Sequence, residues 1–238
     1  MRKVRTQAGD TSSSNDPILN ELTAKMRRFA WLLREHGASV EIDSAAARGA
    51  WALLPEGIKH QALGGFSRYQ SNCEELSRAG ISLRDNNALL AHTLMRANLF
   101  AKEDLPGFVT DQNIVEIYNL DHIQIFRTIN FFDLCNYSLL DLLAREWFVL
   151  YERLSSVTEH AMREFLQTLE SGKLRRLSVP IHLLKERDSD PRGIFQFDFR
   201  YCCPLFSAHE VSGGYLLTEN VTEIDLYAAG EDGFAFLR

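Results

Sequence analysis

The chain has 238 residues, 45% of them hydrophobic, which is enough to bury the core of one large domain or two small ones. Its net charge of −6 argues against a nucleic-acid-binding protein, because such proteins usually carry a basic face. The sequence has no apolar run of about 18 residues, so it predicts no membrane span. The start lacks the apolar segment of a secretory signal.

The cysteines also bear on the cellular compartment. They form neither a Cys-x-x-Cys pair nor a spacing typical of zinc sites. We therefore expect reduced thiols in a cytoplasmic protein. The four cysteines are Cys73, Cys135, Cys202 and Cys203.

The first hundred residues predict helices. Residues 1–16 are polar and predict a disordered tail. Asp16 and Pro17 are typical of a helix start, and an apolar stripe from Ile18 to Leu33 predicts a helix over 18–36. Further helices are predicted over 44–54, 56–79 with a break near Gly64 and Gly65, and 83–103. Residues 17–105 are thus expected to form a helical region.

The pattern changes after residue 107. Segments 114–118 and 123–129 predict a β-hairpin. Short helical pieces over 130–143 and a helix over 154–169 follow. Strands are then predicted over 174–186, 194–206 and 214–224. This order indicates an α+β fold, a five-stranded antiparallel sheet with helices grouped on one face.

The stretch 193–203 is the clearest strand. Its residues alternate with a period of two, which separates them onto opposite faces of a sheet. One face is expected to be a single buried layer of Phe195, Phe197, Phe199 and Tyr201. The other face carries Gln196, Asp198 and Arg200, and there we expect the N-terminal helices or a partner to lie.

Three stretches resemble conserved segments of PAS domains. Residues 130–138 read Asn-Phe-Phe-Asp-Leu-Cys-Asn-Tyr-Ser and are similar to the Asn that opens a short helix before a Gly-Tyr-Ser turn, with Asn136 in place of the Gly. Residues 139–148 look like the segment that follows, with Ala144 at a usual Gly. Residues 214–223 resemble the closing strand, with Asn220 in place of Asp. The resemblance covers 112–226.

The resemblance implies a PAS-like sensor domain over 110–228, followed by a tail over 229–238. PAS domains mostly sense signals or pair proteins, and their pocket lies between the sheet and the short helices. The alternative is a solid core without a ligand, which is what apolar stripes more often form. The residues expected to line a pocket for a small apolar ligand are Phe131, Leu134, Tyr137, Leu143, Trp147, Phe165, Ile181, Phe197 and Phe199.

Two cofactors are known from PAS domains, haem and flavin. Haem-binding members carry a His on the long helix about eleven residues before a Gly, whereas His160 lies twelve residues before Gly172. That difference turns the side chain by roughly 100°, which favours a helix-surface histidine over a haem ligand. The Asn-Cys-Arg-Phe-Leu-Gln stretch of flavin-binding members is absent, which argues against flavin. His182 is expected on the surface of the sheet.

The resemblance therefore favours a cytoplasmic, bacterial-type regulatory sensor without catalytic activity. It would act by binding a ligand, a partner protein or a second copy of itself through the N-terminal helices and the sheet face. One alternative is a ligand-responsive DNA-binding regulator, although no basic recognition helix is seen. Another is an enzyme with His160 or His182 as acid–base residue, although neither has a paired nucleophile nearby in sequence.

Overall fold

The structure is a computed structural model that describes residues 16–105, 107–120, 124–153, 155–209 and 212–224. The predicted tails, residues 1–16 and 229–238, lie outside the described residues except for Asp16. No helix among the described residues is both long and apolar enough to span a bilayer.

The four predicted N-terminal helices are confirmed, but the predicted break near Gly64 and Gly65 is wrong, because the third helix is continuous over Glu56–Arg78. Asp16 begins the first of them, since its carboxylate accepts hydrogen bonds of 3.0 Å from the amides of Ile18 and Leu19. The fourth ends before its predicted boundary because Asn98 adopts a left-handed conformation with φ of 53°. The helices are α1 (Pro17–Glu35), α2 (Ala45–Leu53), α3 (Glu56–Arg78) and α4 (Asn86–Ala97).

The rest of the described chain forms a curved antiparallel sheet with short helices inserted between its strands. The strands are β1 (Leu99–Phe100), β2 (Ile114–Tyr118), β3 (Gln124–Arg127), β4 (Tyr151–Glu152), β5 (Arg175–Arg176), β6 (His182–Glu186), β7 (Ile194–Ser207) and β8 (Ser212–Glu223). The helices are η1 (Ile129–Asp133), α5 (Leu139–Ala144), α6 (Trp147–Leu150) and α7 (Ser155–Ser171).

The strand order in space is β3-β2-β8-β7-β6-β4, and β1 and β5 pair with β7. All the pairs are antiparallel, so the α+β class and the antiparallel sheet are confirmed. The sheet is larger than the five strands predicted, because the two-residue strands β1, β4 and β5 extend it.

The prediction for the faces of β7 is correct in its first half and wrong at Tyr201. Phe195, Phe197 and Phe199 belong to one buried layer, and we call their side of the sheet the aromatic face. The pairing of β7 with β8 shifts by one residue between Phe199 and Tyr201. Such a bulge moves every later side chain to the other face. Cys202 therefore continues the aromatic layer, whereas the ring of Tyr201 contacts Phe108 at 4.9 Å.

The predictions for Ile181 and His182 are also wrong. Residue 181 precedes β6, which begins only at His182, so the alternation predicted for 174–186 does not hold there. Ile181 is 58% exposed. His182 pairs with Phe197 and is buried on the aromatic face, with its ring 5.8 Å from that of Phe199.

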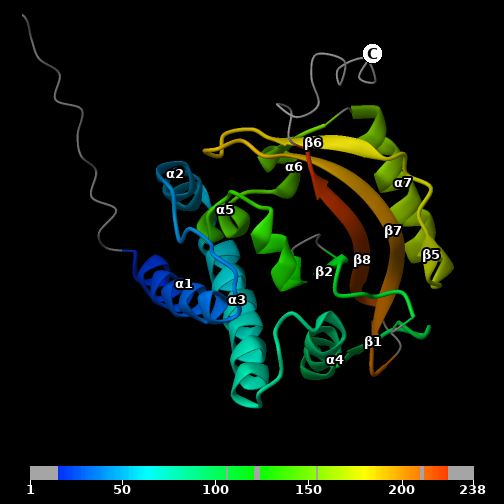
Figure 1. Cartoon of the computed structure of the whole chain (residues 1–238), viewed down its shortest axis with the longest axis horizontal. Helices are drawn as coiled ribbons and strands as arrows, with labels where there is room; N and C mark the ends of the chain where they lie inside the picture. Colours follow the sequence, from blue (N-terminus) through cyan, green and yellow to red (C-terminus); the bar gives the residue numbers. More distant parts are fainter. Residues whose placement is uncertain (1–15, 106, 121–123, 154, 210–211, 225–238) are drawn as a thin grey trace, which may run out of the picture.

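The N-terminal helices do not take the predicted place on the polar face of β7. Figure 1 shows α5 between α2 and the curved strands β7 and β8. Helix α1 packs on α3, α2 packs on α5, and α3 packs on α4 and β3. The apolar stripe of α1 is buried within the chain, so Leu22, Met26, Phe29 and Leu33 are fully inaccessible to solvent.

Candidate ligand-binding pocket

A pocket of about 1090 Å³ lies between α3, the helices α5 to α7 and the aromatic face of the sheet. This volume is slightly above the range of about 300–1,000 Å³ that is typical of small-molecule sites. Most of its wall is apolar. The larger apolar side chains that line it are Phe66, Tyr69, Tyr118, Phe126, Phe131, Phe132, Leu142, Leu143, Trp147, Leu150, Tyr151, Met162, Phe165, Leu184, Phe197, Phe199, Tyr215 and Leu217.

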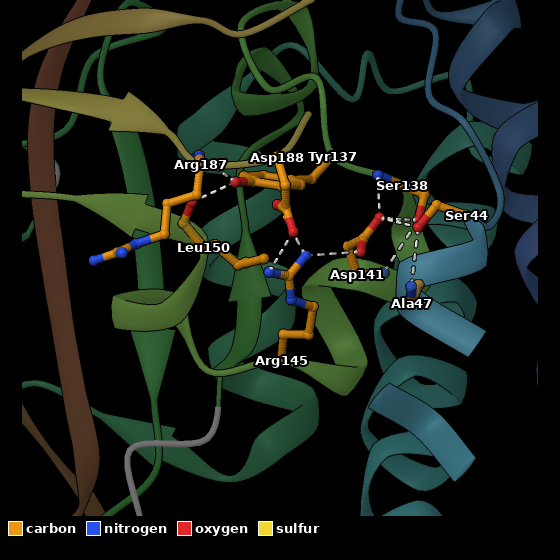
Figure 2. Close-up of polar contacts among 9 residues, drawn as sticks. All are labelled: Ser44, Ala47, Tyr137, Ser138, Asp141, Arg145, Leu150, Arg187 and Asp188. Atoms are coloured by element: carbon orange, nitrogen blue, oxygen red, sulfur yellow. Dashed lines mark hydrogen bonds and ion pairs between the residues drawn. The ribbon is translucent and has the colours of Figure 1, made fainter. Parts of the chain in front are cut away.

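Helix α5 forms part of the wall, and local sequence explains where it begins. Ser138 caps the helix by accepting a hydrogen bond from the amide of Asp141, whose carboxylate bonds back to the amide of Ser138 at 3.2 Å. The same carboxylate accepts a 3.0 Å hydrogen bond from the hydroxyl of Ser44, the residue that caps α2 (Figure 2). One buried carboxylate thus joins the starts of both helices.

The other end of α5 is joined to the loop after β6. Arg145 donates hydrogen bonds to Asp141 at 3.3 Å and to both oxygens of Asp188 at 3.1 and 2.9 Å (Figure 2). These bonds hold the pKa of the Asp188 carboxyl below its ordinary value. The Tyr137 hydroxyl donates to the carbonyl of Leu150 and accepts from the amide of Arg187. The wall that α5 and α6 build is therefore fixed at both ends.

Aromatic rings from α7 and the sheet meet at the back of the pocket. Phe165 of α7 packs edge-on against Phe199, with ring centroids 5.8 Å apart. It also lies parallel to Tyr215 at 6.2 Å, and Tyr215 in turn stacks on Tyr118 at 5.4 Å. These contacts hold α7 against the aromatic face by burying large apolar surfaces.

One region of the wall is polar, and we call it the charged cluster: Glu116, Arg127, Arg153 and Glu219. All four side chains line the pocket, and Glu116, Arg127 and Glu219 are at least nine-tenths buried. Arg127 lies 3.6 Å from Glu116, which also accepts a 2.8 Å hydrogen bond from the Tyr118 hydroxyl. Buried charges are costly unless they are paired, so this cluster is unlike the rest of the wall.

Burial changes the ionisation of two members of the charged cluster. Loss of solvent, reinforced by the nearby Glu116, raises the pKa of Glu219 well above its ordinary value. Burial also lowers the pKa of Arg153 to about 10. Perturbed groups that line a cleft are typical of functional sites.

The structure places the predicted pocket residues in two groups. Leu134, Tyr137 and Ile181 are not on the wall: Leu134 and Tyr137 pack in the core beside it, and Ile181 faces solvent. The residues that do line the pocket are Phe131, Leu143, Trp147, Phe165, Phe197 and Phe199.

The two histidines singled out in the sequence lie off the wall. His160 is half-buried on α7 and does not line the pocket. His182 donates from Nδ1 to the carbonyl of Pro180 at 2.9 Å, and burial lowers its pKa. Within the described ranges, no group of three or more His, Cys, Asp or Glu side chains is arranged to hold a metal ion.

The charged cluster was missed from the sequence, although a signal was present. Glu116 and Glu219 stand inside apolar strand segments at positions whose neighbours two residues away, Tyr118 and Leu217, are buried. A carboxyl group at an inward position of a strand is a candidate functional group. Only the pairing of β2 with β3 and β8 shows that Glu116, Arg127 and Glu219 meet.

No protein-family model matches the sequence, and no curated protein shows significant similarity to it. The function is therefore inferred from the pocket itself. An apolar cavity with a few convergent polar groups is suited to binding an organic molecule and fixing its orientation.

Proposed function

We propose that the chain is a PAS-type regulatory sensor of the cytoplasm, which binds a small molecule in the pocket and passes the signal to a partner protein or a second copy. The order of the elements supports this proposal. Apart from the two-residue strands β4 and β5, two strands (β2, β3) are followed by short helices (η1, α5, α6), then by the long helix α7 and three strands (β6, β7, β8). This is the order that the resemblance to PAS domains implies.

The observation that carries the proposal is the pocket between the aromatic face and the helices. A solid core would have filled this space with side chains, since protein interiors are close-packed. Instead, about 1090 Å³ lies between walls that α5, α7 and the strands hold in place. The structure is thus suited to a ligand that fills the space between these walls.

The alternatives have less support. The enzyme alternative expected His160 or His182 in a cleft, and both lie off the pocket wall. The DNA-binding alternative needs a basic helix, and the chain as a whole is acidic. Binding without chemistry is the simplest use of a pocket that is mainly apolar.

A pair of variants on α7 tests whether the pocket binds a ligand. Met162 lines the pocket, whereas Leu166, one turn later, is 53% exposed. Met162→Trp is expected to fill part of the pocket and weaken binding of the neutral dye Nile red at least about tenfold. Leu166→Trp should leave the affinity within about twofold of wild type. Fluorescence titration measures both.

The proposal fails if wild-type protein does not bind the dye, or if both substitutions change its affinity equally. Mass spectrometry and an absorption spectrum of the purified protein complement the titration. A co-purified small molecule that is absent from the Met162→Trp variant would identify the natural ligand.

A further inference from the structure

The charged cluster contains nitrogen atoms that have no hydrogen-bond partner among the described residues. These atoms are Nη1 of Arg127 and Nε of Arg153, and both are buried. A buried donor left unpaired destabilises the folded protein, so such atoms are rare. Both arginines line the pocket. Two side chains of the pocket wall therefore carry donors that the described residues leave unpaired, which makes both arginines candidates to bind an acceptor of a ligand.

The two guanidinium groups are held in place by aromatic rings. The Arg127 guanidinium carbon lies 3.8 Å from the ring centre of Phe131, and that of Arg153 lies 4.2 Å from the ring centre of Trp147. These cation–π contacts orient the planar groups without using their hydrogen-bond donors. The cluster is therefore pre-organised to receive an acceptor.

The charges of the cluster do not balance. Glu116 lies within ion-pair distance of Arg127. Burial favours the neutral form of Glu219, because it raises the pKa of that carboxyl group well above its ordinary value. Arg153, with a pKa of about 10, stays protonated at neutral pH. Among the described residues Arg127 has an ion-pair partner and Arg153 has none, so a ligand with one negative charge could pair with the Arg153 guanidinium.

Other charged side chains of the wall do not change this balance. Arg145 is already paired with Asp141 and Asp188. Arg68, His60 and Glu146 are exposed at the rim, where solvent screens their charge. The uncompensated charge therefore belongs to the buried end of the pocket.

We propose that the pocket binds an organic monocarboxylate whose carboxylate meets Arg127 and Arg153 and whose apolar body lies against the aromatic wall. Arginine donors match the geometry of a carboxylate, which can accept two hydrogen bonds side by side. A phosphate monoester carries a charge between −1.5 and −2 at pH 7. It would bring more negative charge toward Glu116 than one guanidinium balances. This inference rests on the proposed function, because it names the ligand class of the same pocket.

A charge series of ten-carbon probes tests the proposal on the full chain. The probes are decanoate, decan-1-ol and decyltrimethylammonium, and each is titrated against protein loaded with Nile red. Decanoate is expected to displace the dye at a concentration at least about tenfold lower than decan-1-ol, because charge-assisted hydrogen bonds favour it. The cation should bind weakest. This comparison needs no substitution, so it does not depend on a variant that folds.

Substitution of Arg153 tests whether the preference for decanoate depends on the charge of this side chain. Arg153→Met keeps most of the length of the side chain and removes its charge. It should weaken decanoate binding at least about tenfold and leave decan-1-ol within about twofold of wild type. Arg68→Met is the matched control, since Arg68 lines the same pocket from the exposed rim. It should change neither affinity by more than about twofold. Circular dichroism of each variant checks that it is folded.

The outcomes separate this inference from the function on which it rests. If decan-1-ol or the cation binds as tightly as decanoate, the monocarboxylate proposal is wrong while the ligand-binding pocket stands. The monocarboxylate proposal is also wrong if Arg68→Met weakens decanoate binding as much as Arg153→Met does. If the dye binds but none of the three probes displaces it, only the monocarboxylate proposal fails. If the wild-type protein does not bind the dye, both proposals fail.

Discussion

Glu219 is the residue at which burial and charge conflict most. It is 2% exposed, and the groups that influence its ionisation are Glu116, Arg153 and Arg127. Burial outweighs the attraction of the two arginines, so the pKa of Glu219 in the folded protein is raised. In the unfolded chain the carboxyl group returns to an ordinary pKa.

This difference predicts a pH-dependent effect of Glu219→Gln. Above the pKa of the unfolded chain and below that of the folded protein, only the folded protein holds the proton. The free energy of unfolding of the wild type therefore falls as pH rises through this window, by about 1.4 kcal/mol per pH unit. Glutamine stays neutral, so the stability of Glu219→Gln relative to wild type should rise between pH 5 and pH 8. Urea unfolding of both proteins at pH 5 and pH 8 measures this difference in the free energy of unfolding.

Glu223→Gln is the control, because Glu223 is exposed at the end of the same strand. Its stability relative to wild type should stay constant between the two pH values. Equal behaviour of Glu219→Gln and Glu223→Gln would show that Glu219 ionises in the folded protein like a surface carboxylate.

The polar end of the pocket illustrates what sequence alone leaves open at this scale. An aromatic residue reveals its burial through periodicity, which is how Phe197 and Phe199 were predicted in a buried layer. Their place on a pocket wall was predicted from the resemblance to PAS domains. A charged residue has no such pattern, and its partner is set by strand pairing. Arg127 and Glu219 are 92 positions apart and come together only because β2 pairs with both β3 and β8.

At the scale of elements, helices were predicted more closely than strands. Capping residues such as Asp16 and Ser44 define helix starts locally, so the sequence contains that information. The face of a strand residue depends on its register, and one bulge reverses it. The bulge after Phe199 moved Tyr201 to the other face, and the late start of β6 exchanged the roles of Ile181 and His182.

The connections between elements depend on Glu186, the last residue of β6. Its side chain is fully buried and accepts four hydrogen bonds. They come from the amide and side chain of Asn136 at 2.9 and 3.0 Å, from the Ser189 hydroxyl at 2.6 Å and from the amide of Gly193 at 2.8 Å. One carboxylate thus joins the turn before α5 to the loop between β6 and β7.

Glu186→Ala should destabilise the protein by about 3 kcal/mol or more, because it leaves several buried donors without an acceptor. Glu152→Ala is the matched control on the neighbouring strand β4, where Glu152 is exposed and pairs with Lys185 in the ladder. That change is expected to stay within about 0.5 kcal/mol. Urea unfolding curves give both values. A loss below about 1 kcal/mol for Glu186→Ala would contradict the role given to this carboxylate.

At the scale of the whole molecule, the helical region and the sheet share one hydrophobic core. A single cluster of buried residues includes Leu22 and Met26 of α1, Ile117 of β2 and Leu216 of β8. The Tyr69 hydroxyl of α3 donates a 2.6 Å hydrogen bond to the carbonyl of Arg127 in β3. The spacing of apolar residues predicted a helical region followed by a sheet, but the extent of their contact depends on tertiary packing.

Phe29 of α1 lies where these parts meet, so its removal tests whether they unfold as one unit. It is fully buried, and its ring contacts Phe66 and Tyr69 of α3 at 5.4 and 5.2 Å and Phe132 of η1 at 6.0 Å. Phe29→Ala should lower the free energy of unfolding by about 3–5 kcal/mol. Hydrogen exchange should show this loss equally in the slowest amides of α3 and β8, because both open through global unfolding.

Trp31→Ala is the control on the same helix, since Trp31 is 59% exposed. It should change the free energy of opening, measured by hydrogen exchange in α3 and β8, by no more than about 0.5 kcal/mol. If Phe29→Ala accelerates exchange in α3 and leaves β8 unchanged, the helical region opens independently of the sheet. Since α3 supplies one wall of the pocket, equal losses in α3 and β8 would mean that a bound ligand stabilises the helical region together with the sheet. The proposed function requires such coupling, because a signal could reach a partner through the N-terminal helices only if they respond to the ligand.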